Sequence, residues 1–177
     1  MTVVRPAGLE HVAGIRRVCT RAWWDTYEGL IPDEEIEATL ETYYDTDRLT
    51  LEVLDPDGWD GWLVAIDDGD VVGAGGGGMV EADVGEVYVL YVDPTAQRRG
   101  IGTRLLEHMT TQQRAQGATA QVVSVAEGNE IGRRFYEKHG FELVGDRPTF
   151  GETLSGISLR FRRSIPDDGA GGAKRNP

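Results

Sequence analysis

The sequence has a single cysteine, no long apolar run and few lysines, and each shortage excludes a class of protein. Cys19 is the only cysteine among 177 residues, so no disulfide can form within the chain. The longest uncharged run of weakly apolar residues, 71–80, is ten residues long and half glycine, which is too short to span a bilayer. Residues 1–6 do not have the layout of a signal peptide. These absences predict a cytoplasmic protein that does not enter membranes.

Positive charge is also scarce. Thirty Asp and Glu residues face 18 Lys and Arg residues, which gives a formal net charge of −12, and only Lys138 and Lys174 are lysines. A GC-rich genome would explain the preference for arginine over lysine, but not the net charge. Adaptation to a salty cytosol explains both, because a dense carboxylate surface stays hydrated while salt screens its self-repulsion. So acidic a surface is not expected to bind nucleic acid.

The length and composition are those of one domain. A chain with 40% hydrophobic residues can bury one ordinary core, which predicts a domain over residues 1–163. Residues 164–177 are rich in Gly, Asp and Pro, so we expect a disordered tail there. The three histidines are scattered and are expected on the surface. No group of His, Cys or carboxylate residues has the spacing of metal ligands, so no metal is expected.

The most informative segment runs from Glu86 to Thr103. An apolar strand is followed by a turn at Pro94, a basic bend with Gly100 and Gly102, and the start of a helix. The first N–H groups of a helix have no partner within it, and with the helix dipole they form an anion site. Because two glycines let the backbone approach a ligand closely, this segment predicts a site for a pyrophosphate group.

Two familiar phosphate loops are excluded by the spacing. Leu105 stands where the dinucleotide-binding fingerprint requires its third glycine, and no Gly-Lys-Ser/Thr sequence follows the bend. The pattern Gln97-x-x-Gly100-x-Gly102 after a strand resembles instead the acyl-CoA motif of the GNAT acetyltransferase superfamily.

A second segment supports this resemblance. Residues 129–141 are similar to the family pattern Asn-x-x-Ala-x-x-Phe-Tyr-x-x-x-Gly-Phe, with Gly132 in place of the usual Ala. The two motifs occur in the family's order and at its usual separation. On these motifs the sequence is identified as a member of the superfamily over about residues 3–162, most strongly over 86–145.

Apolar periodicity and turn signals predict a mixed α/β (α+β) fold. Strands are expected over 3–5, 62–66, 71–80, 86–92, 121–125, 141–145 and 153–162, and helices over about 9–29, 33–43, 100–116 and 130–139. Asp33 is a candidate cap for the second helix, residues 67–70 form a hairpin turn, and the glycines of 75–78 suggest a bulge or a close backbone approach. The resemblance implies the GNAT fold, a mostly antiparallel sheet flanked by helices. It also implies that strands 86–92 and 121–125 splay apart after the Pro turn.

The resemblance implies that acetyl-CoA is the co-substrate. Backbone N–H groups of residues 98–103 would hold the pyrophosphate, and the strand end at residues 90–92 would pair with the pantetheine amides. Asn129 is both a good helix N-cap and a match to the family's CoA-contacting asparagine. The implied cofactor-binding residues are Leu90, Tyr91, Val92, Gln97, Arg98, Arg99, Gly100, Ile101, Gly102, Thr103, Asn129 and Tyr136.

Two residues match catalytic positions of the family. Tyr136 matches the residue that protonates the leaving thiolate, and its alternative is a core tyrosine beside Phe135. Glu86 matches the base of histone-type members, acting through a water or after burial, and its alternative is a solvated carboxylate at a strand end. A second family position for the base holds Ser124 here, and the nearby Glu127 is a weak candidate.

The acceptor would lie near the first two helices. Trp24, Tyr27 and Tyr44 are candidate walls of a pocket for an amine, while Trp23 and Tyr43 are expected in the core. A polyamine, an aminoglycoside-like compound, an amino acid and a protein N-terminus or lysine all remain open as acceptors.

The sequence thus predicts an N-acetyltransferase that moves an acetyl group to a primary amine by direct transfer in a ternary complex. Cys19 lies far from both motifs and has no evident histidine partner, so a covalent enzyme intermediate is not expected. The alternative is a non-catalytic acyl-CoA-binding sensor or partner module on the same fold. A homodimer is possible, since dimers are the commonest assemblies.

The net charge leads to a first prediction. We expect the melting temperature to rise between low and molar KCl, because screening eases the repulsion between carboxylates. Circular dichroism melts at increasing KCl measure this directly. A melting temperature that does not change over that range would leave genomic arginine bias as the better explanation of the composition.

Overall fold

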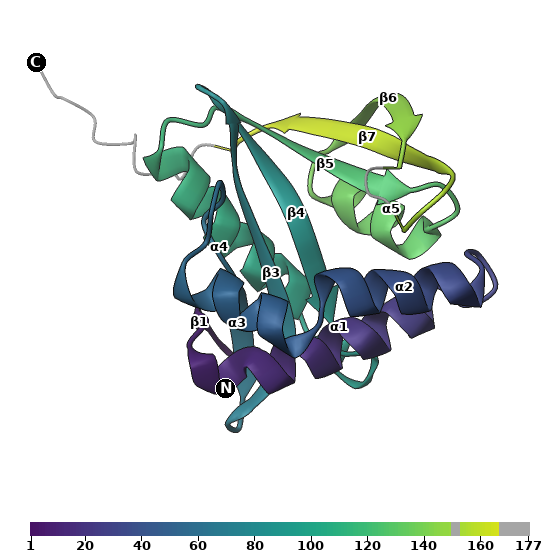
Figure 1. Cartoon of the computed structure of the whole chain (residues 1–177). Helices are drawn as coiled ribbons and strands as arrows, with labels where there is room; N and C mark the ends of the chain where they lie inside the picture. The colour runs from purple at the N-terminus through teal and green to yellow at the C-terminus, as the bar shows by residue number, and fades with distance from the viewer. Residues whose placement is uncertain (150–152, 167–177) are drawn as a thin grey trace, which may run out of the picture.

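The computed structural model describes residues 1–149 and 153–166, which form one seven-stranded sheet with helices packed against it (Figure 1). The strand order is β1-β2-β3-β4-β5-β7-β6, in which β4 and β5 are parallel and all other neighbours antiparallel. The strands are β1 (Val3–Pro6), β2 (Leu63–Asp67), β3 (Asp70–Glu81), β4 (Val84–Val92), β5 (Ala120–Ala126), β6 (Glu142–Pro148) and β7 (Ile157–Ser164). The helices are α1 (Val12–Tyr27), α2 (Asp33–Tyr43), α3 (Thr46–Leu54), α4 (Ile101–Ala115) and α5 (Glu130–Lys138), and 3-10 turns lie at Leu9–His11 and Pro94–Ala96. The expected fold class is confirmed.

Two core clusters divide the helices between them. The first cluster holds the buried faces of α1, α2 and α3, with Ile15, Ile36 and Leu49 fully buried. The second cluster joins α4 and α5 to the sheet through Leu105 and Tyr136, among others. None of the helices in the described part of the chain is long and apolar enough to cross a membrane.

The glycines of residues 75–78 lie where the sequence analysis expects a bulge or a close approach, and both are present. The register between β3 and β4 shifts between Gly76 and Gly77. A Cβ on Gly77 would lie 2.0 Å from the carbonyl oxygen of Glu86, and one on Gly76 would lie 2.4 Å from that of Gly61. These positions must be glycine because neighbouring backbone occupies the space of a side chain.

Helix α3 is absent from the sequence-based expectation. Its N-terminus is capped by Asp45, whose Oδ1 accepts from the backbone N–H of Arg48 at 2.8 Å, and Leu49 anchors it in the first core cluster. The helix has nine residues, and Leu49 is the one buried residue in it, so its periodicity is faint. Asp33 is a second correction, because it is the first residue of α2 and Pro32 occupies the N-cap.

The first three residues of the expected tail, 164–166, are ordered parts of the fold. Ser164 completes β7, and the N–H of Ile165 donates to the carbonyl of Thr119 at 2.9 Å. Arg114 donates through Nη2 to the carbonyl of Pro166 at 2.6 Å, so three residues of the expected tail are held to the body of the domain. The rest of that expectation falls on residues 167–177, which lie outside the described residues.

The close approach at Gly77 leads to a stability prediction. Gly77→Ala should destabilise the fold by about 1–3 kcal/mol, because the added methyl meets backbone that cannot move without parting β3 from β4. The matched control is Gly145→Ala in β6, where a Cβ meets no atom within 4 Å and the effect should stay within about 0.5 kcal/mol. Urea unfolding followed by circular dichroism gives both values. Equal unfolding midpoints for the two variants would contradict the packing argument.

Candidate active site

Strands β4 and β5 pair over only four residues and then diverge. Their parallel register runs from Val84↔Ala120 to Val87↔Val123, while β5 continues beside β7 to Ala126. Figure 1 shows the two strands side by side at their starts and apart at their carboxyl ends. The expected splay is therefore present, but it begins within β4 rather than after the Pro turn. The β3–β4 bulge explains this, because Val87 and Val89 pair with successive glycines of β3 and Tyr88 is left over.

Beyond Val87, the edge of β4 that faces β5 has no strand partner among residues 1–149 and 153–166. The side chain of Tyr91 packs into the first core cluster against Trp23 and Tyr44. The main chain of residues 88–92 thus borders the splay while its side chains fix its position. Such an edge can pair with an extended ligand that carries amide groups.

The bend between β4 and α4 collects unpaired N–H groups. Within the described residues, no protein acceptor is recorded for the backbone N–H groups of residues 98–103. Arg98 and Gly100 have positive φ angles of 64° and 75°, which turn the bend into the start of α4. Successive N–H groups at a helix start form a concave anion site. The guanidinium group of Arg99 is not free to bind an anion there, since its Nη2 donates to Oδ2 of Asp67 at 2.5 Å.

Gly102 has a packing role, whereas Gly100 is required by its positive φ angle. A Cβ at Gly102 would lie 3.2 Å from the ring of Phe135, so this glycine lets α4 approach α5 closely. Thr103 then joins the two helices, with its Oγ1 3.0 Å from Nε2 of His139. His139 is partly buried rather than a surface residue, and its pKa is lowered by burial and by the nearby charges of Arg163 and Lys138.

Three polar side chains lie close together beside the splay, Tyr27 from α1, Asn129 at the N-cap of α5 and Tyr136 within α5. Asn129 caps α5, and its Oδ1 accepts from the N–H of Gly132 at 2.9 Å, which confirms the capping interpretation. Burial raises the pKa of Tyr136, and the neighbouring Tyr27 raises it further. Burial also raises the pKa of Tyr27, an effect that the side chain of Asn129 partly opposes. Both phenols are therefore neutral hydrogen-bond donors at neutral pH.

Glu86 is neither solvated nor isolated. Its side chain is 12% exposed, and Nη1 of Arg160 donates to its Oε1 at 2.6 Å. Nη2 of Arg147 lies 3.8 Å from the same oxygen. Both arginines also donate to Oγ of Ser124, Arg160 at 2.7 Å and Arg147 at 3.2 Å. The alternative of a solvated strand-end carboxylate is therefore wrong.

This charged cluster lies on the sheet face opposite α4. Val87, Val123 and Phe161 point into the second core cluster, and Glu86, Ser124 and Arg160 alternate with them along β4, β5 and β7. Neither arginine is among the site residues predicted from the sequence. Their signal is the alternation of Arg160 with Phe161 on β7, but only the order β5-β7-β6 shows that Arg147 and Arg160 face Glu86.

The aromatic residues near the first two helices are placed differently from the prediction. Trp23 is in the core as expected, but Tyr44 is also there, only 5% exposed and packed against Trp23, Trp62 and Tyr91. It cannot form an open pocket wall. Tyr43, expected in the core, is partly exposed with Arg48 4.8 Å above its ring. Trp24 is partly exposed, and Tyr27 is buried beside the splay.

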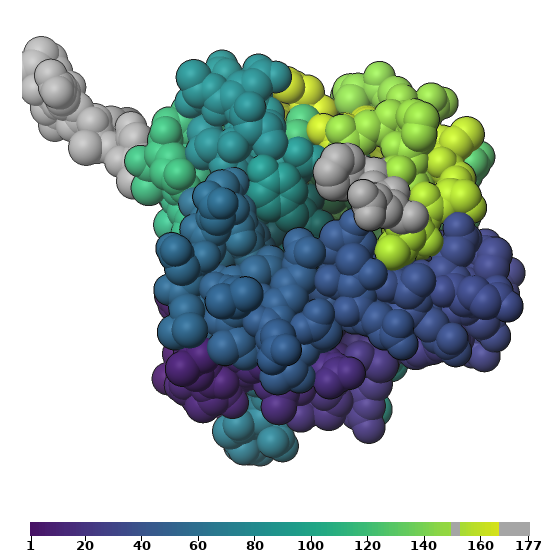
Figure 2. Space-filling model, in the orientation of Figure 1, coloured from purple at the N-terminus to yellow at the C-terminus, as the bar shows by residue number. Residues whose placement is uncertain are grey.

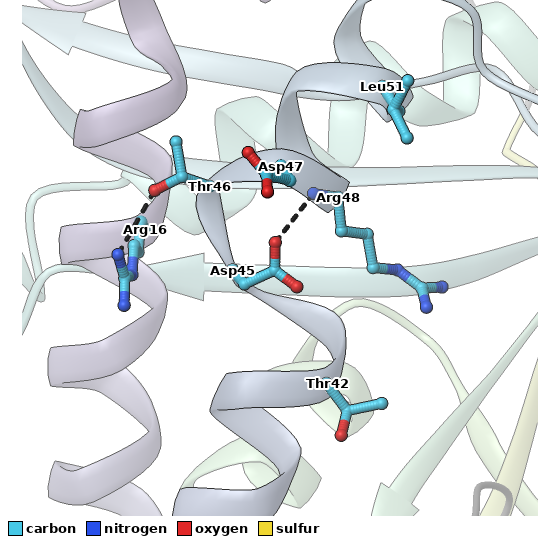
Figure 3. Close-up of a pocket in the computed structure, with 7 residues that line it drawn as sticks. All are labelled: Arg16, Thr42, Asp45, Thr46, Asp47, Arg48 and Leu51. Carbon is cyan, nitrogen blue, oxygen red and sulfur yellow. Dashed lines mark hydrogen bonds between the residues drawn. The ribbon is translucent and has the colours of Figure 1, made fainter.

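The face with the charged cluster is bordered by α2 and the end of the β6–β7 hairpin. Ser155 donates through its N–H to Oε1 of Glu35 at 2.8 Å, and the hydroxyls of Thr39 and Thr153 are 2.8 Å apart. In Figure 2, yellow-green residues of the β6–β7 hairpin lie against the blue surface of α2. A separate hollow of about 580 Å³ lies between α1 and α3, where Arg16 donates to Thr46 and Asp45 caps α3 (Figure 3). It contains none of the site residues.

Comparisons with known proteins agree with this geometry. A family model described as the acetyltransferase (GNAT) family matches residues 18–141. A probable N-acetyltransferase of Mycobacterium tuberculosis is 30% identical over 115 residues, which are 62% of this chain and 64% of that protein. The mycothiol acetyltransferase of Beutenbergia cavernae is 36% identical over 91 residues, 51% of this chain and 31% of that protein. The matches cover between 20% and 64% of the lengths of the curated relatives.

A solved structure shares the fold across its whole length. The PaiA N-acetyltransferase of Thermoplasma acidophilum, in complex with coenzyme A, superimposes with a TM-score of 0.79 at 22% identity over 93% of this chain and 99% of that one. The family model spans both sequence motifs and more than half of the chain. The chain therefore belongs to the acetyltransferase (GNAT) family.

Proposed function

We propose that the protein is an acetyl-CoA-dependent N-acetyltransferase that moves an acetyl group to a primary amine by direct transfer in a ternary complex. The observation that carries this proposal is the unpaired edge of β4. This edge begins after Glu86 and Val87, at the last pair of the β4–β5 ladder, and ends before the bend that holds the N–H groups of residues 98–103. Family membership and the coenzyme A bound by the Thermoplasma relative support it.

The residues fit acetyl-CoA at two places. The unpaired N–H groups of residues 98–103, with Arg98 beside them, suit a pyrophosphate. The free edge of residues 90–92 suits a ligand arm that carries amides, and an N–H there would polarise the thioester carbonyl. The proposed binding residues are those named from the sequence, with Arg99 assigned a supporting part because Asp67 holds it.

Tyr136 acts as a hydrogen-bond donor to the leaving sulfur. Proton transfer from a phenol near pKa 10 to a thiolate near 8.5 is uphill by about 2 kcal/mol. Burial raises the pKa of Tyr136, which makes full transfer harder and keeps the hydroxyl protonated over the whole physiological range. A neutral, positioned donor stabilises charge that develops on sulfur.

Glu86 assists the amine, which must lose a proton because alkyl ammonium groups have a pKa of about 10. Its Oε1 is engaged by Arg160, so this task falls to Oε2, acting through a water. Cys19 is not a nucleophile, because burial and, to a lesser extent, Glu52 raise the pKa of its thiol. A buried, protonated Cys19 supports direct transfer over a cysteine-bound intermediate. Trp24 and Tyr27 are the proposed walls on the acceptor side.

The anion site leads to a prediction about CoA affinity. Gly100→Asp should weaken CoA binding at least tenfold, about 1.4 kcal/mol, relative to Gly100→Asn. Both residues tolerate the positive φ of 75°, and a Cβ at this position meets no atom within 4 Å, so the two variants differ mainly in charge at the N–H groups. Calorimetric titration with CoA measures the difference. Equal affinities for the two variants would remove residues 98–103 as the pyrophosphate site.

Catalysis by Tyr136 leads to a second prediction. The wild-type protein should release thiol from acetyl-CoA in the presence of primary amines, and Tyr136→Phe should lower kcat by about 10²–10⁴ with little change in CoA affinity. Because the pKa of Tyr136 is raised, the loss should be uniform between pH 6 and 9. The control is Tyr43→Phe, outside the site. CoA binding without amine-dependent thiol release would favour the sensor alternative, and wild-type turnover by Tyr136→Phe would make Tyr136 a core residue only.

A further inference from the structure

The cluster around Glu86 has more positive than negative charge. Two guanidinium groups, of Arg147 and Arg160, meet one carboxylate, and both donate to the same oxygen of Ser124. Like charges this close repel, and one carboxylate compensates only one of them. In a protein with a formal net charge of −12, this is a locally basic spot.

Arg147 is the accessible member of the cluster. Its side chain is 44% exposed, against 20% for Arg160. The contacts of Arg147 with Glu86 and Ser124 both use Nη2. Within residues 1–149 and 153–166, no acceptor is recorded for its other guanidinium nitrogens. An arginine anchored at one nitrogen presents the rest of its planar fork to a carboxylate.

The cluster lies where an acceptor has to approach. Val87 and Val123 form the last pair of the β4–β5 ladder. Glu86 directly precedes Val87, and Ser124 directly follows Val123. Its members point to the face opposite α4, while the proposed pyrophosphate site lies at the start of α4. The arm of acetyl-CoA would occupy the splay, so an amine coming from the opposite face meets Glu86 and Arg147 beside the thioester.

We propose that the acceptor is an amine with a carboxylate a few bonds away, as in an amino acid, and that Arg147 binds this carboxylate. The proposal rests on the proposed function and names its substrate class. Glu86 lies 3.8 Å from Arg147, so an ammonium group that faces Glu86 and a carboxylate on Arg147 belong to one small zwitterion. Arg160 and Ser124 act as positioning residues that hold Arg147 and Glu86 in place.

Binding of matched ligands to the protein–CoA complex tests this. L-α-amino acids, their primary amides and the corresponding decarboxylated amines are titrated calorimetrically into wild type, Arg147→Gln, Arg147→Lys and Arg16→Gln. In the wild type, acids should bind at least tenfold more tightly than their amides. Arg147→Gln should lose this preference while binding of the amides changes less than twofold, and Arg147→Lys should keep part of it. Arg16→Gln is the matched control, because it removes one guanidinium group too, but from α1 and outside the site (Figure 3). It should behave as wild type.

Acids that bind no more tightly than amides, or a preference that survives in Arg147→Gln, would overturn the assignment. Thiol release with the same ligands separates it from the proposed function. A protein that prefers the acids through Arg147 but acetylates no amine would retain this site and lose the transferase proposal. Equal kcat/KM values for acids and amides would overturn this site and leave the transferase proposal intact.

Discussion

The site depends on a parallel ladder between β4 and β5 that is held at one end and prevented from continuing at the other. At the held end, Nε2 of Gln113 on α4 donates to the carbonyl of Glu86 at 2.9 Å, and Nε2 of Gln121 donates to Oε1 of Gln113 at 2.9 Å. Both side chains are fully buried, so leaving either amide unpaired would be costly. Gly85 leaves room for Gln113, because a Cβ there would lie 2.0 Å from its Oε1. These buried amides fix the two strands together over four residues.

At its carboxyl end, the β4–β5 ladder stops early, and the stabilisation that further strand pairing would give is lost. The bulge at Tyr88 redirects β4, and Tyr88 itself is 43% exposed. Past this point the backbone groups of β4 lose the partner that a longer ladder would supply, and a buried backbone group without a partner is unfavourable. A ligand with amides can supply the missing partners. The same glycine-rich stretch of β3 that permits the bulge therefore also opens the edge that we propose binds acetyl-CoA, so the fold and the proposed function depend on one local irregularity.

The parts of this arrangement that are set locally could be predicted from the sequence, and those set by strand order could not. The hairpin at residues 67–70, the cap at Asn129 and the helix start at Gly100 follow from a few adjacent residues, and all three are present. The pairing of Glu86 with Arg160 joins positions 74 apart and requires β7 to lie between β5 and β6. The burial of Tyr44 likewise depends on Trp62, which directly precedes β2, and on Tyr91 of β4.

The acidic surface and the basic cluster act over different distances. A net charge of −12 repels an anionic ligand at long range, but the Debye length is about 8 Å at physiological ionic strength and about 3 Å at 1 M salt. In a salty cytosol the repulsion is screened before a ligand reaches the splay. A contact with Arg147, whose side chain is 44% exposed, is made at hydrogen-bond distance and includes directed hydrogen bonds as well as charge attraction. A zwitterion carries no net charge, so the acidic surface does not repel it as a whole, and such a surface is compatible with a carboxylate-bearing substrate.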